Sequence, residues 1–186
     1  IDEEMFTKIV ENRSVRDKDA RDTAKIVGLA AIKYGDLSNQ ATKDYIFDVD
    51  RFTSFEGNTG PYILYTIVRI KSILNRYVEA GGNLEAGEIL PASNSSEKNL
   101  MLQLSGFGSM IESAFEEKAP HKICAYIYEV SNAFNSFYHE TKILSEENQT
   151  QKESYIRLLQ LTKKVLETSI DLLGFCLLYT SPSPRD

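Results

Sequence analysis

The sequence predicts a mostly α-helical fold, in which an antiparallel helical bundle follows a shorter N-terminal part. Two observations lead to this prediction. Apolar residues recur at spacings of three and four over much of the chain, which places them on one side of a helix. Clusters of Gly, Pro and Asn divide that pattern into segments of helical length. Because the connections are short to moderate, neighbouring helices should run antiparallel.

The N-terminal part is expected to hold two helices and a loop. Residues 1–12 read as the end of a helix. Asp17-Lys18-Asp19 begins the second helix, with carboxylates in the first turn where the helix dipole favours them, and Gly35-Asp36 ends it. In residues 44–55 polar and apolar residues nearly alternate, which predicts a short extended segment or an ordered loop.

Four long helices are expected after this loop. The first begins at Pro61, a favourable first helical residue, and ends before Gly81-Gly82-Asn83. The second covers residues 97–118, and the third begins at Pro120. The fourth is expected to start at a T-x-x-E capping box, Thr150 to Glu153, and to end at Gly174. Apolar stripes are expected on the second helix (Leu100, Leu104, Ile111, Phe115) and the third (Ile123, Ile127, Val130, Phe134, Phe137).

Composition indicates a folded domain, or a domain with part of another. The 186 residues are 42% hydrophobic and 26% charged. The net charge of −6 weighs against nucleic-acid binding only weakly, because binding depends on where positive charge clusters. Two cysteines give no disulfide framework and suit the cytosol, and no apolar run approaches the ~20 residues that span a bilayer. Since the first residue is Ile1, we expect the chain to begin inside a longer protein.

The final segment, residues 176–186, reads C-L-L-Y-T-S-P-S-P-R-D. It resembles the in-frame translation of a transposase sequencing adapter, and a natural flexible tail is the alternative. We therefore expect that the gene is cut off after Phe175 and read on into adapter, and we leave the last residues out of the fold prediction.

The helix expected over residues 61–77 has two opposed faces. One is apolar and should face the core (Ile63, Ile67, Ile70, Leu74, Tyr77). The other carries Tyr62, Tyr65, Arg69, Ser72 and Arg76, without a carboxylate. Tyrosine rings can stack on unpaired bases and guanidinium groups can bind phosphates, so this face suits a single-stranded RNA loop. From the pattern alone, burial of the tyrosines against a neighbouring helix stays open.

Three ordered blocks resemble the arginyl-tRNA synthetase family. The first is D-Y-I-F-D at residues 44–48 followed by S-F-E-G-N-T-G-P-Y-I-L-Y at residues 54–65. The second is P-H-K-I-C-A-Y-I-Y-E at residues 120–129, and the third runs from Leu158 to Gly174. The likeness covers nearly all of residues 20–175.

The resemblance implies a class I enzyme that joins arginine to tRNA-Arg using ATP with magnesium. Residues 1–55 would be the end of the catalytic domain and stem-contact region, and residues 56–175 a DALR-type anticodon-binding helical domain. The family's H-x-G-H and K-M-S-K-S adenylation motifs are absent. We expect them upstream, so no residue here is assigned a catalytic role and the chain alone should hold no cofactor. A cytoplasmic monomer is expected.

The resemblance also implies the residues of the RNA site. In the family, two tyrosines and an arginine form a pocket for an anticodon base, and they match Tyr62, Tyr65 and Arg69. Tyr128 matches a position that borders the anticodon loop. Lys25 and Lys33 could touch phosphates, although solvated lysines are the simpler interpretation. The family often ends in a Met that helps the anticodon site, and adapter-like sequence replaces that ending here.

Other functions fit the sequence less well. A related class I enzyme such as the cysteinyl-tRNA synthetase, or a tRNA-binding or scaffolding helical module without chemistry, would keep the fold. A metal site is not expected, because the spacing of His121, Cys124 and His139 offers too few convergent ligands. The set Asp44, Asp48 and Asp50 lacks the Gly and Glu of a calcium loop.

Overall fold

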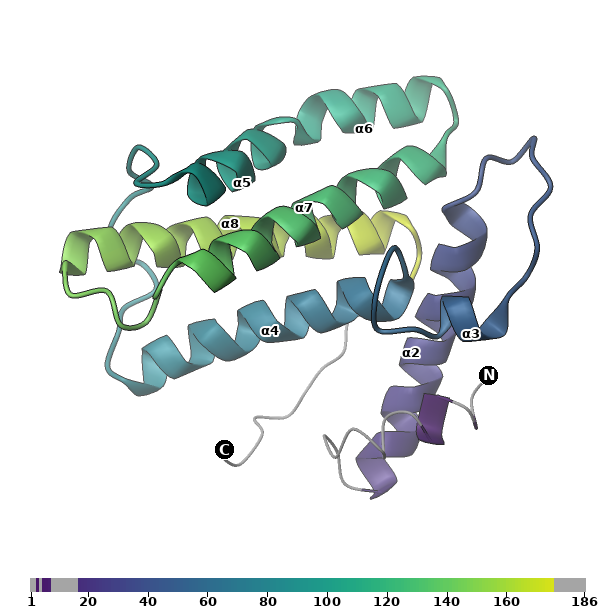
Figure 1. The fold of residues 1–186 in the computed structure, drawn as a ribbon, viewed down its shortest axis with the longest axis horizontal. Helices are drawn as coiled ribbons and strands as arrows, with labels where there is room; N and C mark the ends of the chain where they lie inside the picture. The colour runs from purple at the N-terminus through teal and green to yellow at the C-terminus, as the bar shows by residue number, and fades with distance from the viewer. Residues whose placement is uncertain (1–2, 4, 8–16, 176–186) are drawn as a thin grey trace.

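The computed structural model of the chain describes residues 3, 5–7 and 17–175. These residues form helices joined by loops, without a strand, which confirms the mostly α-helical prediction. The helices are α2 (Asp17–Leu37), α3 (Val49–Phe52), α4 (Gly60–Glu79), α5 (Ser95–Ser105), α6 (Phe107–Glu116), α7 (Pro120–Glu140) and α8 (Gln149–Leu172). Helices α4 to α8 run along the long axis of the molecule, and α2 crosses their direction at one end (Figure 1).

Two parts of the prediction lie wholly or partly outside the described residues. Of the helix expected over residues 1–12, only residues 3 and 5–7 are described, and they are helical. The adapter-like segment, residues 176–186, is not described. None of the described helices is long and apolar enough to cross a membrane.

Helix α4 begins and ends close to where the sequence predicts. The Thr59 hydroxyl accepts a hydrogen bond from the backbone N–H of Tyr62 (3.2 Å), which caps the helix, and Pro61 lies in its first turn. At the other end Gly81 has a φ of +88°, and the N–H of Gly82 donates to the carbonyl of Tyr77 (2.9 Å). This glycine-based cap ends the helix, because Gly81 adopts the left-handed conformation.

The core face of α4 is buried as predicted, and it contacts both α7 and α8. The members of this face are Ile63, Ile67, Ile70, Leu74 and Tyr77, and all are at most 5% exposed. From α7 the core receives Ile127, Val130, Phe134 and Phe137, and from α8 Leu158, Leu159, Leu166 and Ile170. Because this side of α4 is fixed in the core, its opposite side must face outward.

The predicted helix over residues 97–118 is wrong as a single element, because the chain forms two helices that meet at Gly106. Glycine is a poor helix former, and no side chain caps α6 at this residue. The interruption also changes which side of the chain faces the core. Leu100 and Leu104 are buried as expected, whereas Phe115 is 83% exposed.

The predicted capping box of the last helix is also wrong. The N-cap is Asn148, whose side-chain oxygen accepts from the N–H of Gln151 (3.1 Å). Thr150 already lies inside α8, and Asn is at least as good an N-cap as Thr. The end at Gly174 is confirmed: its φ is +74°, and the N–H of Phe175 donates to the carbonyl of Ile170 (3.2 Å).

The segment after α2 is an ordered loop that contains one short helix. Helix α2 continues to Leu37, two residues past Gly35, where the sequence predicts its end. Helix α3 lies within residues 44–55, for which the sequence predicts a short extended segment or an ordered loop. The Asp48 carboxylate caps α3 by accepting from the N–H of Arg51 (3.1 Å). Phe52 is buried and lies against Gly35, where a Cβ would approach the Phe52 ring to 2.7 Å.

The crossing of α2 and α4 should depend on Gly60. A Cβ at this residue would come within 2.4 Å of the Ala30 carbonyl oxygen, which is backbone and cannot rotate away. We therefore expect Gly60→Ala to lower the free energy of unfolding by about 1–3 kcal/mol, measured by urea denaturation.

Gly108→Ala is the matched control for Gly60→Ala. It lies in α6, and a Cβ there would meet nothing within 4 Å. The helix propensity of alanine should raise the free energy of unfolding by about 0.5–1 kcal/mol. Equal effects of the two substitutions would contradict the assigned contact between Gly60 and Ala30.

Candidate nucleic-acid interface

A chain of three hydrogen bonds joins the outward sides of α4 and α7. Arg69 donates through Nη1 to the side-chain oxygen of Asn135 (3.1 Å), and Asn135 donates through Nδ2 to the Tyr62 hydroxyl (2.7 Å). The Tyr62 hydroxyl donates in turn to the side-chain oxygen of Asn132 (2.9 Å). Each link has one donor and one acceptor, so the chain is internally consistent and fixes the two helices against each other.

The guanidinium group of Arg69 lies between two tyrosine rings. Its Cζ is 4.9 Å from the ring centroid of Tyr65 on α4 and 5.4 Å from that of Tyr138 on α7. Its Nη2 also donates to the Tyr65 hydroxyl (2.9 Å). Cation–π attraction and these hydrogen bonds therefore hold the group in one position before any ligand arrives.

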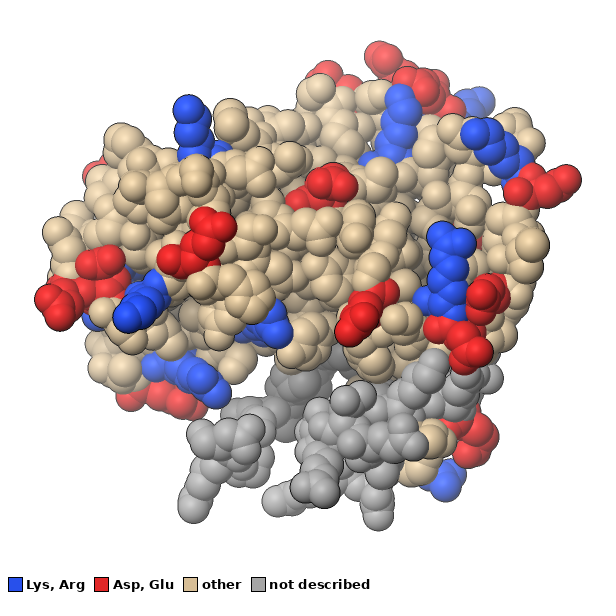
Figure 2. Space-filling view, viewed as in Figure 1, with Lys and Arg blue, Asp and Glu red and all other residues tan. Residues whose placement is uncertain are grey.

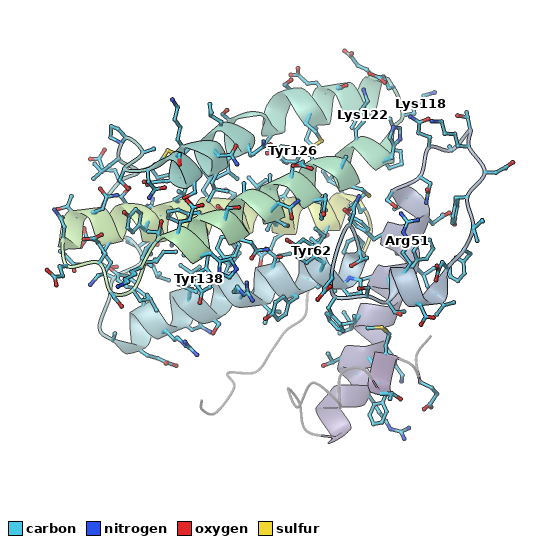
Figure 3. All side chains as sticks on the ribbon, in the orientation of Figure 1. Arg51, Tyr62, Lys118, Lys122, Tyr126 and Tyr138 are labelled. Atoms are coloured by element: carbon cyan, nitrogen blue, oxygen red, sulfur yellow. The ribbon has the colours of Figure 1, made fainter. Side chains whose placement is uncertain are left out.

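Exposure separates the residues that a ligand can reach from those that support them. Tyr65 is 47% exposed and Tyr138 is 37% exposed, so part of each ring is open to solvent. Tyr62 is half-buried, and its ring packs edge-on against Tyr128 at a centroid distance of 5.8 Å. Tyr62 and Tyr138 project from neighbouring helices α4 and α7 (Figure 3). The accessible rings are therefore those of Tyr65 and Tyr138, and the half-buried Arg69 lies beside both.

The environment of Tyr62 keeps its hydroxyl protonated. Burial raises the pKa of Tyr62 above its ordinary value, and nearby Tyr128 acts in the same direction. The hydrogen bond from Asn135 and the charge of Arg69 oppose this rise without cancelling it. A protonated hydroxyl is what the hydrogen bond to Asn132 requires.

The structure brings some of the predicted site residues together and leaves others apart. Tyr62, Tyr65 and Arg69 form one network. Tyr128 packs against Tyr62 of this network. Two further members of the predicted face, Ser72 and Arg76, are exposed farther along α4.

The sequence interpretation did not single out the α7 partners of the site. Asn132 and Asn135 lie on α7 away from its apolar stripe, and Tyr138 lies at the edge of that stripe, stacked on Phe134. The signal was present, because their spacing of three residues is helical and the set is polar and aromatic. Sorting the faces of the predicted helix that begins at Pro120 would have shown this polar side, although not that it lies beside α4.

The two lysines that could touch phosphates have different surroundings. The Lys33 ammonium group donates to the carbonyl of Gly174 after the last turn of α8, so it has a partner within the chain. A cation at the C-terminal end of a helix is stabilising there. Lys25 is exposed on α2, and its phosphate contact stays a prediction.

The described residues hold no group of three or more His, Cys, Asp and Glu side chains that could bind a metal ion. Cys124 is buried on α7, and burial raises the pKa of its thiol to about 12. Because metal ions bind the thiolate, this raises the cost of using Cys124 as a ligand.

Comparison with known proteins identifies the family. The family model of the DALR anticodon binding domain matches residues 63–179, which is more than half of the chain. The chain belongs to the DALR anticodon binding domain family. The match begins within α4 and continues four residues past Phe175. The boundaries predicted after residues 55 and 175 stay predictions.

Relatives of this DALR domain are arginine–tRNA ligases. The chain is 65% identical to that of Agathobacter rectalis over 183 residues, covering 94% of this chain and 31% of the relative. It is 51% identical to that of Alkaliphilus oremlandii, covering 94% and 30%. The chain therefore spans less than a third of the length of these relatives.

Solved arginyl-tRNA synthetases share the fold. The Thermus thermophilus structure superposes with a TM-score of 0.83 at 26% identity, covering 94% of this chain and 30% of that one. The Plasmodium falciparum structure gives 0.82 at 26% identity, covering 95% and 31%. The DALR domain described here thus has the helical arrangement of known synthetases.

Removing the Tyr62 hydroxyl should weaken the DALR fold more than removing that of Tyr65. Tyr62→Phe leaves the amides of Asn132 and Asn135 each without one partner in a half-buried place. We expect a loss of about 1–2 kcal/mol in the free energy of unfolding by urea denaturation. Tyr65→Phe is the control, and it should cost less than about 0.5 kcal/mol because the hydrogen bond that its hydroxyl accepts from Arg69 is exposed. The reverse order would rule out Tyr62 as the support of the site.

Proposed function

We propose that this chain is part of an arginine–tRNA ligase and that its α4–α7 surface binds the anticodon loop of tRNA-Arg. The observation that carries the proposal is the position of Arg69 between the partly exposed rings of Tyr65 and Tyr138. The family match and the names of the relatives support it.

The chemistry of this surface suits an unstacked base. A tyrosine ring offers a flat face on which a base can stack, worth roughly 1–3 kcal/mol per base. Among the described residues, Arg69 uses Nη1 and Nη2 once each. Since a guanidinium has five N–H donors, three are left for a base edge or a phosphate. Because the group is already held in place, little side-chain entropy is lost on binding.

Binding through this surface should depend on local contacts more than on overall charge. Figure 2 shows basic and acidic residues interspersed on the visible face, without a continuous field of either sign. The net charge of −6 gives no general attraction for RNA. We therefore expect a shallow dependence of affinity on salt, because few phosphates are contacted.

The rest of the reaction belongs to residues that this sequence does not contain. In the proposed ligase, ATP with magnesium activates arginine at H-x-G-H and K-M-S-K-S type motifs, and neither occurs here. No residue of this chain is given a role in that step. The cysteinyl-tRNA synthetase alternative has no support from the relatives, which are arginine–tRNA ligases. We further propose a cytoplasmic, monomeric enzyme.

Substitutions at the site should weaken RNA binding without unfolding the chain. Tyr65→Ala and Arg69→Ala each remove a group that would contact a base. Each should weaken binding of a tRNA-Arg anticodon stem-loop about tenfold or more in a fluorescence anisotropy titration. Arg69→Lys should behave like Arg69→Ala, because lysine keeps the charge but lacks the planar fork.

Arg157→Ala is the matched control, since it removes the same charge from α8, where Arg157 donates to the carbonyl of Leu84 (3.2 Å). It should leave the affinity for the RNA within about twofold of that of the unmodified chain, the range expected for a distant surface charge. The thermal midpoint of Tyr65→Ala should stay close to that of the unmodified chain. Normal RNA affinity in the Tyr65 and Arg69 variants, with a large fall of the midpoint, would show that these residues serve packing.

A further inference from the structure

The turn that precedes α4 is fixed by hydrogen bonds of Thr59. The Thr59 hydroxyl donates to the carbonyl of Ser54 (2.6 Å) and accepts from the N–H of Tyr62 (3.2 Å). The conformation of this turn therefore sets where α4 begins. Tyr62 lies in the first turn of that helix, and its hydroxyl bonds to α7. A residue that holds this turn in place therefore also holds Tyr62.

Tyr34 on α2 contacts this turn and α7 at the same time. Its side chain is fully buried, and its hydroxyl donates to the carbonyl of Cys124 on α7 (2.8 Å). The same hydroxyl is hydrogen-bonded to the side-chain amide of Asn58, the residue before Thr59. Three segments that are far apart in the sequence thus meet at one oxygen atom, where α2 crosses the bundle (Figure 1).

The number of protons assigns the direction of the two bonds. A tyrosine hydroxyl has one proton and a backbone carbonyl can only accept, so this proton belongs to the bond with Cys124. Asn58 Oδ1 faces the hydroxyl, and a half-turn of the amide replaces it with Nδ2, which can donate. Burial raises the pKa of Tyr34 far above its ordinary value, which keeps the hydroxyl protonated. The contact is therefore a relay of two hydrogen bonds from the turn to α7.

Both ends of this relay lie next to residues that hold Arg69. On α7, Tyr128 is one turn after Cys124, and its ring packs edge-on against Tyr62 with centroids 5.8 Å apart. On α4, the Tyr62 hydroxyl accepts from Asn135, which in turn accepts from Arg69. A displacement of the turn relative to α7 would therefore move Tyr62 away from its α7 partners and loosen Arg69.

We propose that Tyr34 and Asn58 are positioning residues for the RNA site formed by Tyr65, Arg69 and Tyr138. They hold the start of α4 against α7, so that the guanidinium group stays between its two rings. Tyr34 is fully buried and cannot touch a base, so it acts through the hydrogen-bonded chain between α4 and α7. The consequence for RNA rests on the proposed function, whereas the placement of the guanidinium group can be measured without RNA.

The resonance of the Arg69 side chain tests the positioning in the absence of RNA. Because the guanidinium group lies against the rings of Tyr65 and Tyr138, ring currents should shift its Nε–H proton upfield in NMR spectra of the chain. Tyr34→Phe keeps the edge-on ring contact with Phe175 (centroids 6.3 Å apart) and removes both hydrogen bonds. We expect it to reduce the upfield shift by about half or more, because the side chain is then less confined.

Two further variants accompany Tyr34→Phe. Asn58→Ala breaks the same relay from an exposed residue, so the chain should fold and the Arg69 proton should move in the same direction. Tyr155→Phe is the matched control, because it removes a buried hydroxyl that shares a hydrogen bond with Ser93 (3.0 Å). It lies near the start of α8, at the end of the bundle away from α2 (Figure 1), and should leave the Arg69 proton unmoved.

A double-mutant cycle tests whether the positioning matters for RNA. Tyr34→Phe should weaken binding of a tRNA-Arg anticodon stem-loop about fivefold in a fluorescence anisotropy titration. In an Arg69→Ala background the same change should weaken binding by less than about twofold, because no guanidinium group is left to position. An equal loss in both backgrounds would show that Tyr34 acts through general packing and would overturn the proposal.

The two measurements separate this inference from the proposed function. A chain that binds no stem-loop, but whose Arg69 proton moves in Tyr34→Phe and Asn58→Ala, refutes the function and supports the positioning. An Arg69 proton that stays in place in both variants refutes the positioning, whether or not RNA binds. Equal movement in Tyr34→Phe and Tyr155→Phe refutes it as well, because the loss of any buried hydroxyl would then be sufficient.

Discussion

The candidate site depends on one interaction: the Arg69 guanidinium is fixed between two tyrosine rings by a hydrogen-bonded chain that crosses from α4 to α7. Without Asn135 and Tyr62 behind it, a long and flexible side chain would sample many positions. Fixing this side chain in one position would then cost conformational entropy at each binding event. The buried isoleucines of α4 and the apolar stripe of α7 keep the two helices close enough for that chain to form.

The same constraint explains why the tyrosines of α4 have different roles. Tyr62 lies one turn from the Thr59 cap, and its hydroxyl is shared by two asparagines of α7. It therefore supports the site and offers little free surface. Tyr65 is on the outer edge of the helix, where its hydroxyl reaches Arg69 and part of its ring meets solvent. Of the two possibilities that the sequence left open, packing describes Tyr62, and recognition stays a prediction for Tyr65.

Much of the fold could be predicted from the sequence because its signals are local. The apolar periodicity of α4 and of α7 identifies the buried face of each helix. Pro61 marks the start of α4, and Gly174 marks the end of α8. The break at Gly106 was missed because a single glycine in a helical pattern is often tolerated. The cap of α8 was misplaced because Asn148 and Thr150 are both N-cap residues, and Asn, which the structure uses, ranks above Thr. The α7 half of the site depends on which helices become neighbours, which periodicity within one helix does not specify.

The central claim is that an RNA base stacks beside Arg69, and ring resonances report on this most directly. NMR spectra of the chain are recorded while a tRNA-Arg anticodon stem-loop is added. We expect upfield shifts of the ring protons of Tyr65 and Tyr138, with little change at the buried Tyr155 or at Tyr45 in the loop between α2 and α3. Shifts confined to Tyr45, with Tyr65 and Tyr138 unmoved at saturating RNA, would contradict the account.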